Sequence, residues 1–155
     1  MTDPSPPTSP PQRAPARATT GERIGAGVFA SGCAGVLGLA AWLSPSGDGH
    51  GTHTQIGLPD CAWVQLFDKP CPTCGMTTSF AHTADASYLT AAATQPLGFL
   101  LALGAATAFW AGAHTALTGS RSAHVAMHAV NGRALLVLLG LGLAAWAYKL
   151  ATWGG

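Results

Sequence analysis

The chain has 155 residues and a net charge of +1, and only 8% of its residues are charged while 48% are hydrophobic. A soluble domain normally carries about a quarter charged residues, so this composition favours a membrane protein with one domain. The chain has no basic stripe and no acidic tail. Nucleic-acid binding therefore has no electrostatic support, and we expect no nucleic-acid partner.

The first part of the chain predicts a tail followed by a membrane span. Residues 1–23 are rich in proline, serine and threonine, which favours a disordered tail. Residues 24–43 carry no charged side chain, and about 20 apolar residues cross a bilayer as a helix. A cleaved signal peptide is less favoured because Ser44-Pro45 offers a poor cleavage site, and a lipoprotein site at Cys33 is less favoured because the residues after Cys33 stay apolar.

The rest of the chain predicts an outer loop and two further spans. Residues 44–95 are more polar and contain the box Cys71-Pro72-Thr73-Cys74-Gly75-Met76-Thr77, followed by short helical segments. Residues 96–117 and 134–153 are apolar, and residues 118–133 form a connection between them. The predicted fold is an all-α membrane protein with three transmembrane helices and a short interfacial helix after a cysteine knuckle.

Charged residues predict the orientation of these spans. The tail holds three arginines and the 118–133 connection holds two, whereas the 44–95 loop holds one lysine against four aspartates. Lys and Arg near span ends favour the cytoplasmic side. We expect a multi-pass protein of the bacterial inner membrane with a cytoplasmic N-terminus. Its cysteine loop and C-terminus then face outward, into a potentially oxidising space.

Small residues recur every four positions in the first two spans. Such faces allow helices to approach closely in lipid. Besides the lipid bilayer, we expect other membrane proteins or a second copy of the chain as partners, through the faces Gly27, Ser31, Gly35 and Gly104, Ala108, Gly112.

The spacing of three cysteines in the loop indicates a candidate metal site. Two cysteines separated by two residues can both reach one tetrahedral ion, and zinc takes such ligands. The expected ligands are Cys61, Cys71, Cys74 and His53, with His82 or His50 as the alternative fourth ligand. A left-handed Gly75 would allow the turn between the thiols and the next helix.

Two other interpretations of the same cysteines stay open. Cys61 can form a structural disulfide with Cys71 or Cys74, which would fasten the loop. Alternatively, Cys71 and Cys74 can exchange disulfides, because a helix N-terminus lowers the pKa of a thiol. No thioredoxin-like pattern surrounds the box, which disfavours exchange. Elsewhere, His114, His124 and His128 have no role that the sequence defines, and an interfacial position is favoured over metal or haem binding.

The cysteine pattern resembles the bacterial membrane-protein family known as domain of unknown function 2752. The resemblance covers roughly residues 50–117 and includes Cys61, the box, and the Gln95-Pro96-Leu97 segment that opens the second span. Thr78 and Gln95 replace the arginine and asparagine of the family pattern. The resemblance implies no reaction and no catalytic residues.

The sequence therefore favours a small membrane subunit or assembly factor, with no catalytic residues assigned. In this prediction its outer loop is held by a metal or a disulfide and contacts partner proteins. A membrane thiol–disulfide oxidoreductase that uses Cys71 and Cys74 is the alternative.

Overall fold

The computed structural model describes residues 17–120 and 132–153, and these residues form helices and loops without any strand. Most of the predicted tail and connection, with His124 and His128, lies outside the described residues. Three of the described helices are long and apolar enough to cross a membrane, which confirms the predicted fold class. They are α1 (Thr20–Trp42), α5 (Pro96–Thr118) and α7 (Gly132–Ala151).

The helix α1 begins at Thr20, before the first residue of the predicted span. Thr19 and Glu22 form a capping box: the Glu22 carboxylate accepts from the Thr19 backbone N–H at 2.7 Å, and the Thr19 hydroxyl accepts from the Glu22 N–H at 3.3 Å. This reciprocal pair satisfies two donors that a helix start leaves unpaired. The span therefore includes a polar first turn that its apolar run did not indicate.

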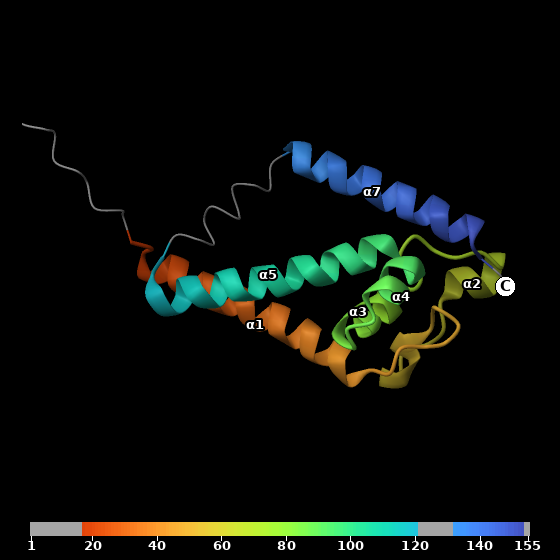
Figure 1. Cartoon of the computed structure of the whole chain (residues 1–155), viewed down its shortest axis with the longest axis horizontal. Helices are drawn as coiled ribbons and strands as arrows, with labels where there is room; N and C mark the ends of the chain where they lie inside the picture. The colour runs from red at the N-terminus through yellow and green to blue at the C-terminus, as the bar shows by residue number, and fades with distance from the viewer. Residues whose placement is uncertain (1–16, 121–131, 154–155) are drawn as a thin grey trace, which may run out of the picture.

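The helices α1 and α5 run antiparallel and pack along much of their length (Figure 1). Two small residues allow this close approach. A Cβ atom on Gly112 would lie 2.9 Å from the Ala26 carbonyl oxygen, and one on Gly27 would lie 3.5 Å from Ala116 Cβ. Around Gly35 and Gly104, by contrast, a Cβ would find no atom within 4 Å. Only part of each predicted small-residue face is used within the chain, and association with other chains stays a prediction.

An arginine from α1 caps the C-terminal end of α5. The Arg23 guanidinium donates to the carbonyl oxygens of Ala116 and Leu117 at 2.9–3.1 Å, at the last turn of α5. These carbonyls have no partner within the helix, so the side chain from α1 satisfies them. The α5 helix then ends at Gly119, which has a left-handed backbone with φ of +70°.

The opposite end carries the predicted loop, which contains four short helices (Figure 1). In chain order they are η1 (Thr52–Ile56), α2 (Ala62–Phe67), α3 (Met76–Ala84) and α4 (Tyr88–Thr94). The helices α3 and α4 pack against each other and against the start of α5. The buried Ser79 hydroxyl lies 2.9 Å from the Ala91 carbonyl oxygen and 3.1 Å from that of Gln95, which ties α3 to α4 and α5. The cysteines precede α2 and α3 and thus stand on a packed base.

Candidate functional site

The box of cysteines forms a tight turn that leads into α3. The Cys74 N–H donates to the Cys71 carbonyl oxygen at 3.0 Å, and Gly75 follows with φ of +83° at the N-cap of the helix. This confirms the left-handed glycine that the sequence predicted. A Cβ at position 75 would also lie 2.6 Å from the Gly49 carbonyl oxygen, so conformation and space both require glycine here.

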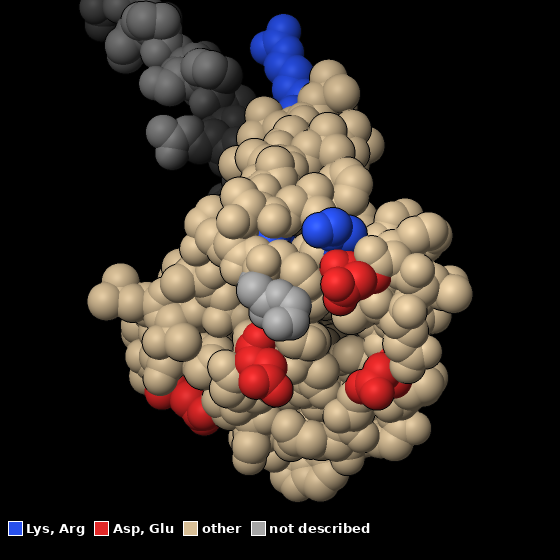
Figure 2. All heavy atoms as spheres, turned by 90° about the vertical axis from the view of Figure 1, so that its right-hand side faces the viewer, with Lys and Arg blue, Asp and Glu red and all other residues tan. Residues whose placement is uncertain are grey.

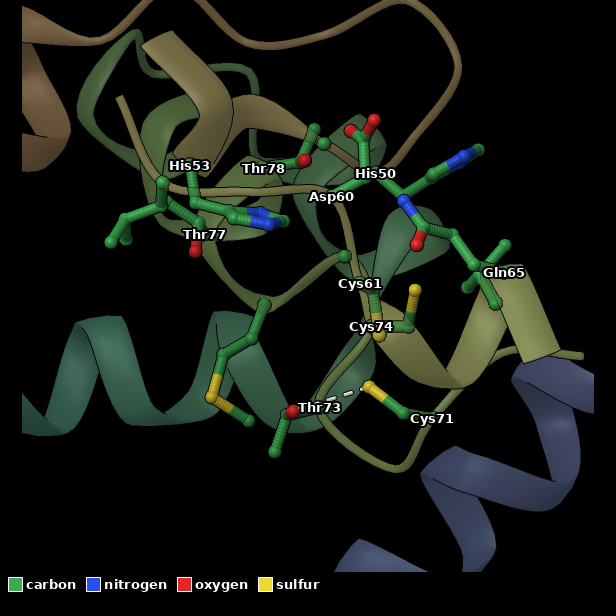
Figure 3. A pocket seen from close by; sticks show the side chains of 15 residues that line it. His50, His53, Asp60, Cys61, Gln65, Cys71, Thr73, Cys74, Thr77 and Thr78 are labelled. Carbon is green, nitrogen blue, oxygen red and sulfur yellow. Dashed lines mark hydrogen bonds between the residues drawn. The ribbon is translucent and has the colours of Figure 1, made fainter. Parts of the chain in front are cut away.

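The turn brings three thiols together. Cys61, Cys71 and Cys74 line one pocket of about 670 Å³, with their sulfur atoms gathered on one side of it (Figure 3). Cys61 arrives from the start of α2, while the other two belong to the turn before α3. All four cysteines of the chain carry free thiols, and Cys33 lies within α1, away from this pocket.

The two cysteines of the turn have different surroundings. Burial alone would raise the pKa of Cys71, but hydrogen bonds from Thr73, and from the Cys61 and Cys74 thiols, outweigh burial and lower this pKa below its ordinary value. The Thr73 hydroxyl lies 3.4 Å from the Cys71 sulfur. Burial raises the pKa of Cys74 to about 11, and charge on Cys71 and Cys61 adds to this effect. Near neutral pH, Cys71 is therefore the more nucleophilic thiol and Cys74 stays protonated.

Two of the three candidate histidines also line the pocket (Figure 3). The Nδ1 atom of His50 donates to the Asp48 carbonyl oxygen at 2.9 Å, and the Nε2 atom of His53 donates to that of Pro59 at 3.2 Å. His82 lies on α3 and is not among the pocket residues. The structure thus brings His50 and His53 to the cysteines and leaves His82 apart from them.

Within residues 17–120 and 132–153, no group of three or more His, Cys, Asp or Glu side chains is arranged to hold a metal ion. The three thiols share a pocket, but the two histidine rings are turned toward backbone carbonyls. Zinc binding by Cys61, Cys71, Cys74 and His53 stays a prediction, and so does a structural disulfide.

The C-terminal end of α7 is hydrogen-bonded to the cysteine loop, a set of contacts that sequence reasoning missed. The Trp146 indole donates to the Pro70 carbonyl oxygen at 3.0 Å, and the Tyr148 hydroxyl donates to that of Ala93 at 3.0 Å. Lys149 Nζ lies 3.3 Å from the carbonyl oxygens of Gly49 and Thr94. These side chains fasten α7 to the cysteine loop, and a lysine within an apolar run was the available signal.

Thr78 and Gln95, which the sequence singled out, are both buried beside the box. Thr78 is fully buried, and its hydroxyl lies 2.8 Å from that of Thr52 in η1. Gln95 is also fully buried, and its side-chain amide donates to the Pro72 carbonyl oxygen at 3.2 Å. Both side chains therefore fasten the turn to neighbouring segments.

The surface at this end of the molecule carries more acidic than basic side chains (Figure 2). Asp60 lines the pocket, and the remaining aspartates of the 44–95 loop are exposed. An excess of one sign of charge at a pocket favours the approach of ligands of the opposite sign.

Comparison with known proteins finds a family match over part of the chain but no function. Residues 61–109 match the family described as "Protein of unknown function (DUF2752)", which confirms the predicted resemblance over these residues. The match starts at Cys61, spans the box, and ends within α5. No curated protein and no solved structure matches the chain. Together with the three apolar helices, the match describes a protein of membrane type whose activity the family does not define.

Proposed function

We propose that this protein is a membrane thiol–disulfide exchange protein in which Cys71 and Cys74 form the reactive pair. The observation that carries the proposal is the placement of a partly exposed thiol and a buried thiol side by side in one pocket. Cys71 is half-buried and has a lowered pKa, whereas Cys74 is buried and has a raised pKa. Exchange needs an accessible thiolate that attacks first and a protected thiol that attacks second.

The exchange proceeds in two balanced steps. The Cys71 thiolate attacks one sulfur of a substrate disulfide, which forms a mixed disulfide and releases one substrate thiolate. Cys74 then loses its proton to water and attacks the Cys71 sulfur, which releases the second substrate thiolate. The substrate gains two electrons and the pair becomes a disulfide; with an oxidised pair and a dithiol substrate, the same steps run in reverse.

The substrate side of the proposal is a protein or small-molecule disulfide outside the cytoplasm. The arginine distribution supports this proposal, because it predicts that the loop lies on the outer side. Labelling of intact cells with a membrane-impermeant thiol reagent tests the orientation. Labelling of Cys71 in intact cells is expected, and labelling that requires membrane disruption would contradict it.

The test of exchange uses the full chain, purified in detergent and reduced, with the aromatic disulfide 5,5′-dithiobis(2-nitrobenzoate). The wild type is expected to release two thionitrobenzoate ions from the Cys71–Cys74 pair in two phases. Cys74→Ser is expected to release one and to keep a mixed disulfide on Cys71, which mass spectrometry detects. Cys71→Ser is expected to lose the fast phase, and the control Cys33→Ser is expected to keep both phases.

The second candidate function is the one that the sequence favoured, a loop held by metal or disulfide that contacts partner proteins. The hydrogen bonds from α7 to the loop favour it, because they make the loop part of the structural frame. It predicts thiols that react only after a chelator has removed one zinc ion, or after reduction of a stable disulfide that joins Cys61 to Cys71 or Cys74. Either result with the wild type would overturn the exchange proposal.

A further inference from the structure

One side of the short helix α2 forms a wall of the thiol pocket. Cys61, at the N-cap of the helix, and Val64 and Gln65 within it all line the pocket. Positions three and four residues apart lie on the same face of a helix, and these three residues have that spacing. The pocket therefore uses one face of α2.

The opposite face of α2 is apolar and exposed. It carries Trp63, Leu66 and Phe67, which have the same spacing and are 45%, 76% and 59% exposed. The rings of Trp63 and Phe67 contact each other, with centroids 5.1 Å apart. No residue of α2 is buried. A contiguous group of large apolar side chains, here named the α2 patch, indicates a surface that binds something apolar.

The position of α2 along the spans indicates what covers the α2 patch. The Trp146 indole of α7 donates to the carbonyl oxygen of Pro70, which follows α2 closely in the chain. Figure 1 likewise shows α2 beside the C-terminal end of α7. The 20 residues of α7 extend about 30 Å, which matches the hydrocarbon core of a bilayer. Trp146 lies about 8 Å before the end of this helix at Ala151, so α2 lies near the edge of the core.

The residue types of α2 suit the interfacial layer at this depth. Tryptophan is enriched there because its ring is apolar while its N–H can reach water. Asp60 and Asp68, on either side of α2, are exposed and can stay hydrated. On α7, Leu143 and Leu150 are 57% and 40% exposed near the same end, so the apolar surface of this span continues to the level of α2.

We propose that the α2 patch lies in the headgroup layer of the bilayer, so that lipid supports one wall of the thiol pocket. A short helix binds such a layer through the apolar area that it buries there. Because the α2 patch and the pocket face are opposite faces of one helix, contact with lipid fixes the position of Cys61 in the pocket. This inference does not depend on whether the thiols exchange disulfides, bind a metal or form a disulfide.

The test measures fluorescence quenching in the full chain, reconstituted in phosphatidylcholine nanodiscs. The signal of Trp63 is the difference between wild type and Trp63→Phe. Three quenchers are compared: lipid brominated near its headgroup, lipid brominated near its chain ends, and iodide in water. Trp110, 71% exposed within α5, is the matched reference for a ring in the core, and its signal is the difference between wild type and Trp110→Phe.

We expect Trp63 to lose more fluorescence with bromine near the headgroup than near the chain ends, and to lose little with iodide. Trp110 should be quenched by brominated lipid as well, but not by iodide. Quenching of Trp63 by iodide without quenching by either lipid would show that the α2 patch faces water and would overturn the proposal. Quenching by none of the three would also overturn it, because protein, such as a second copy of the chain, would then cover the patch.

The link between lipid and the pocket is tested with Leu66→Asp, which places a charge in the α2 patch. We expect Trp63 to lose its quenching by brominated lipid and to gain quenching by iodide. The rate at which a neutral maleimide labels Cys61, assigned by mass spectrometry, should change as well. Leu117→Asp is the matched control, because Leu117 is 80% exposed in the last turn of α5, at the opposite end of the molecule, and it should change neither quantity.

Each result of this variant has a definite meaning. Unchanged quenching of Trp63 in a folded Leu66→Asp protein would overturn the position of the α2 patch in lipid. Lost quenching with an unchanged rate at Cys61 would overturn the support of the pocket by lipid. If Leu66→Asp does not fold, the quenching of Trp63 in the wild type decides the proposal by itself.

Discussion

The two helices that neighbour α5 are held in different ways. The helix α1 packs against α5 through small residues, with Gly112 of α5 against the backbone of α1. The helix α7 makes few contacts with α5, among them Gly142 opposite Leu97, and its C-terminal end is fastened to the cysteine loop by indole, phenol and ammonium groups. Figure 1 shows α7 diverging from α5 toward the beginning of α7.

This difference separates a structural interface from one that is coupled to the candidate site. In lipid, small residues stabilise helix pairs through close van der Waals contact, which depends on shape alone. Hydrogen bonds to loop carbonyls depend instead on the position of the loop. A change in α1–α5 packing should therefore alter stability, whereas a change at the end of α7 should alter the reactivity of the cysteines as well.

The largest loss of stability is expected at the contact between the cysteine turn and the Gly49 segment of the loop before it. Gly75→Ala places a Cβ at a left-handed position, which costs about 1–2 kcal/mol, and this Cβ meets the Gly49 carbonyl oxygen. Overpacking adds about 1–3 kcal/mol. We expect the free energy of unfolding, measured by denaturant titration in micelles, to fall by about 3 kcal/mol, and the reaction of Cys71 to change.

Gly57→Ala is the matched control for this prediction. Gly57 is also left-handed, with φ of +79°, but a Cβ there meets no atom within 4 Å. Only the conformational cost of about 1–2 kcal/mol should appear, and Cys71 should react as in the wild type. Equal losses at both positions would show that the contact with Gly49 contributes nothing.

A smaller loss is expected at the α1–α5 interface. Gly112→Val forces atoms against Ala26 and Ala30 of α1, so we expect about 1–3 kcal/mol less stability on the same titration. Gly104→Val, on the same helix but with open space around it, should lose much less. Both variants should keep the two-phase thiol reaction. A changed reaction in a folded Gly112→Val protein would contradict the separation of the two interfaces.

The smallest effect on stability is expected at the end of α7. Trp146→Phe removes the hydrogen bond to the Pro70 carbonyl oxygen, which should cost about 0.5–1.5 kcal/mol. Because Pro70 directly precedes Cys71, the rate of the first thionitrobenzoate phase should also change. Trp110→Phe, at an exposed position of α5, should change neither quantity. An unchanged first phase in Trp146→Phe would contradict the proposed coupling between α7 and the site.

The sequence predicted the elements better than their contacts. Apolar length was enough to find the spans, since a bilayer requires about 20 apolar residues, and Pro96 marked the first residue of α5. The left-handed Gly75 followed from the turn that two nearby cysteines need. The three loop cysteines lie close together in the sequence between two spans, and in the structure they line the same pocket.

The hydrogen bonds between α7 and the cysteine loop could not be predicted from the sequence, and the reason is physical. Tryptophan, tyrosine and lysine at the end of a span are typical of a membrane interface, and their residue types do not reveal whether they face lipid or protein. Only the tertiary structure shows that Lys149 turns inward. The buried hydrogen bond between Thr78 and Thr52 could not be predicted either, because two hydroxyl groups far apart in the chain give no sequence pattern.

The hydrogen bond between Trp146 and Pro70 also has a consequence for biosynthesis. Its two residues lie 76 positions apart, so the ribosome makes the cysteine turn well before the helix end that completes its surroundings. At about 5–20 residues per second, the delay is about 4–15 s. During this interval the cysteine turn exists without its hydrogen bond to α7, and it is supported by the segments that the chain completes first, among them α3, which directly follows it.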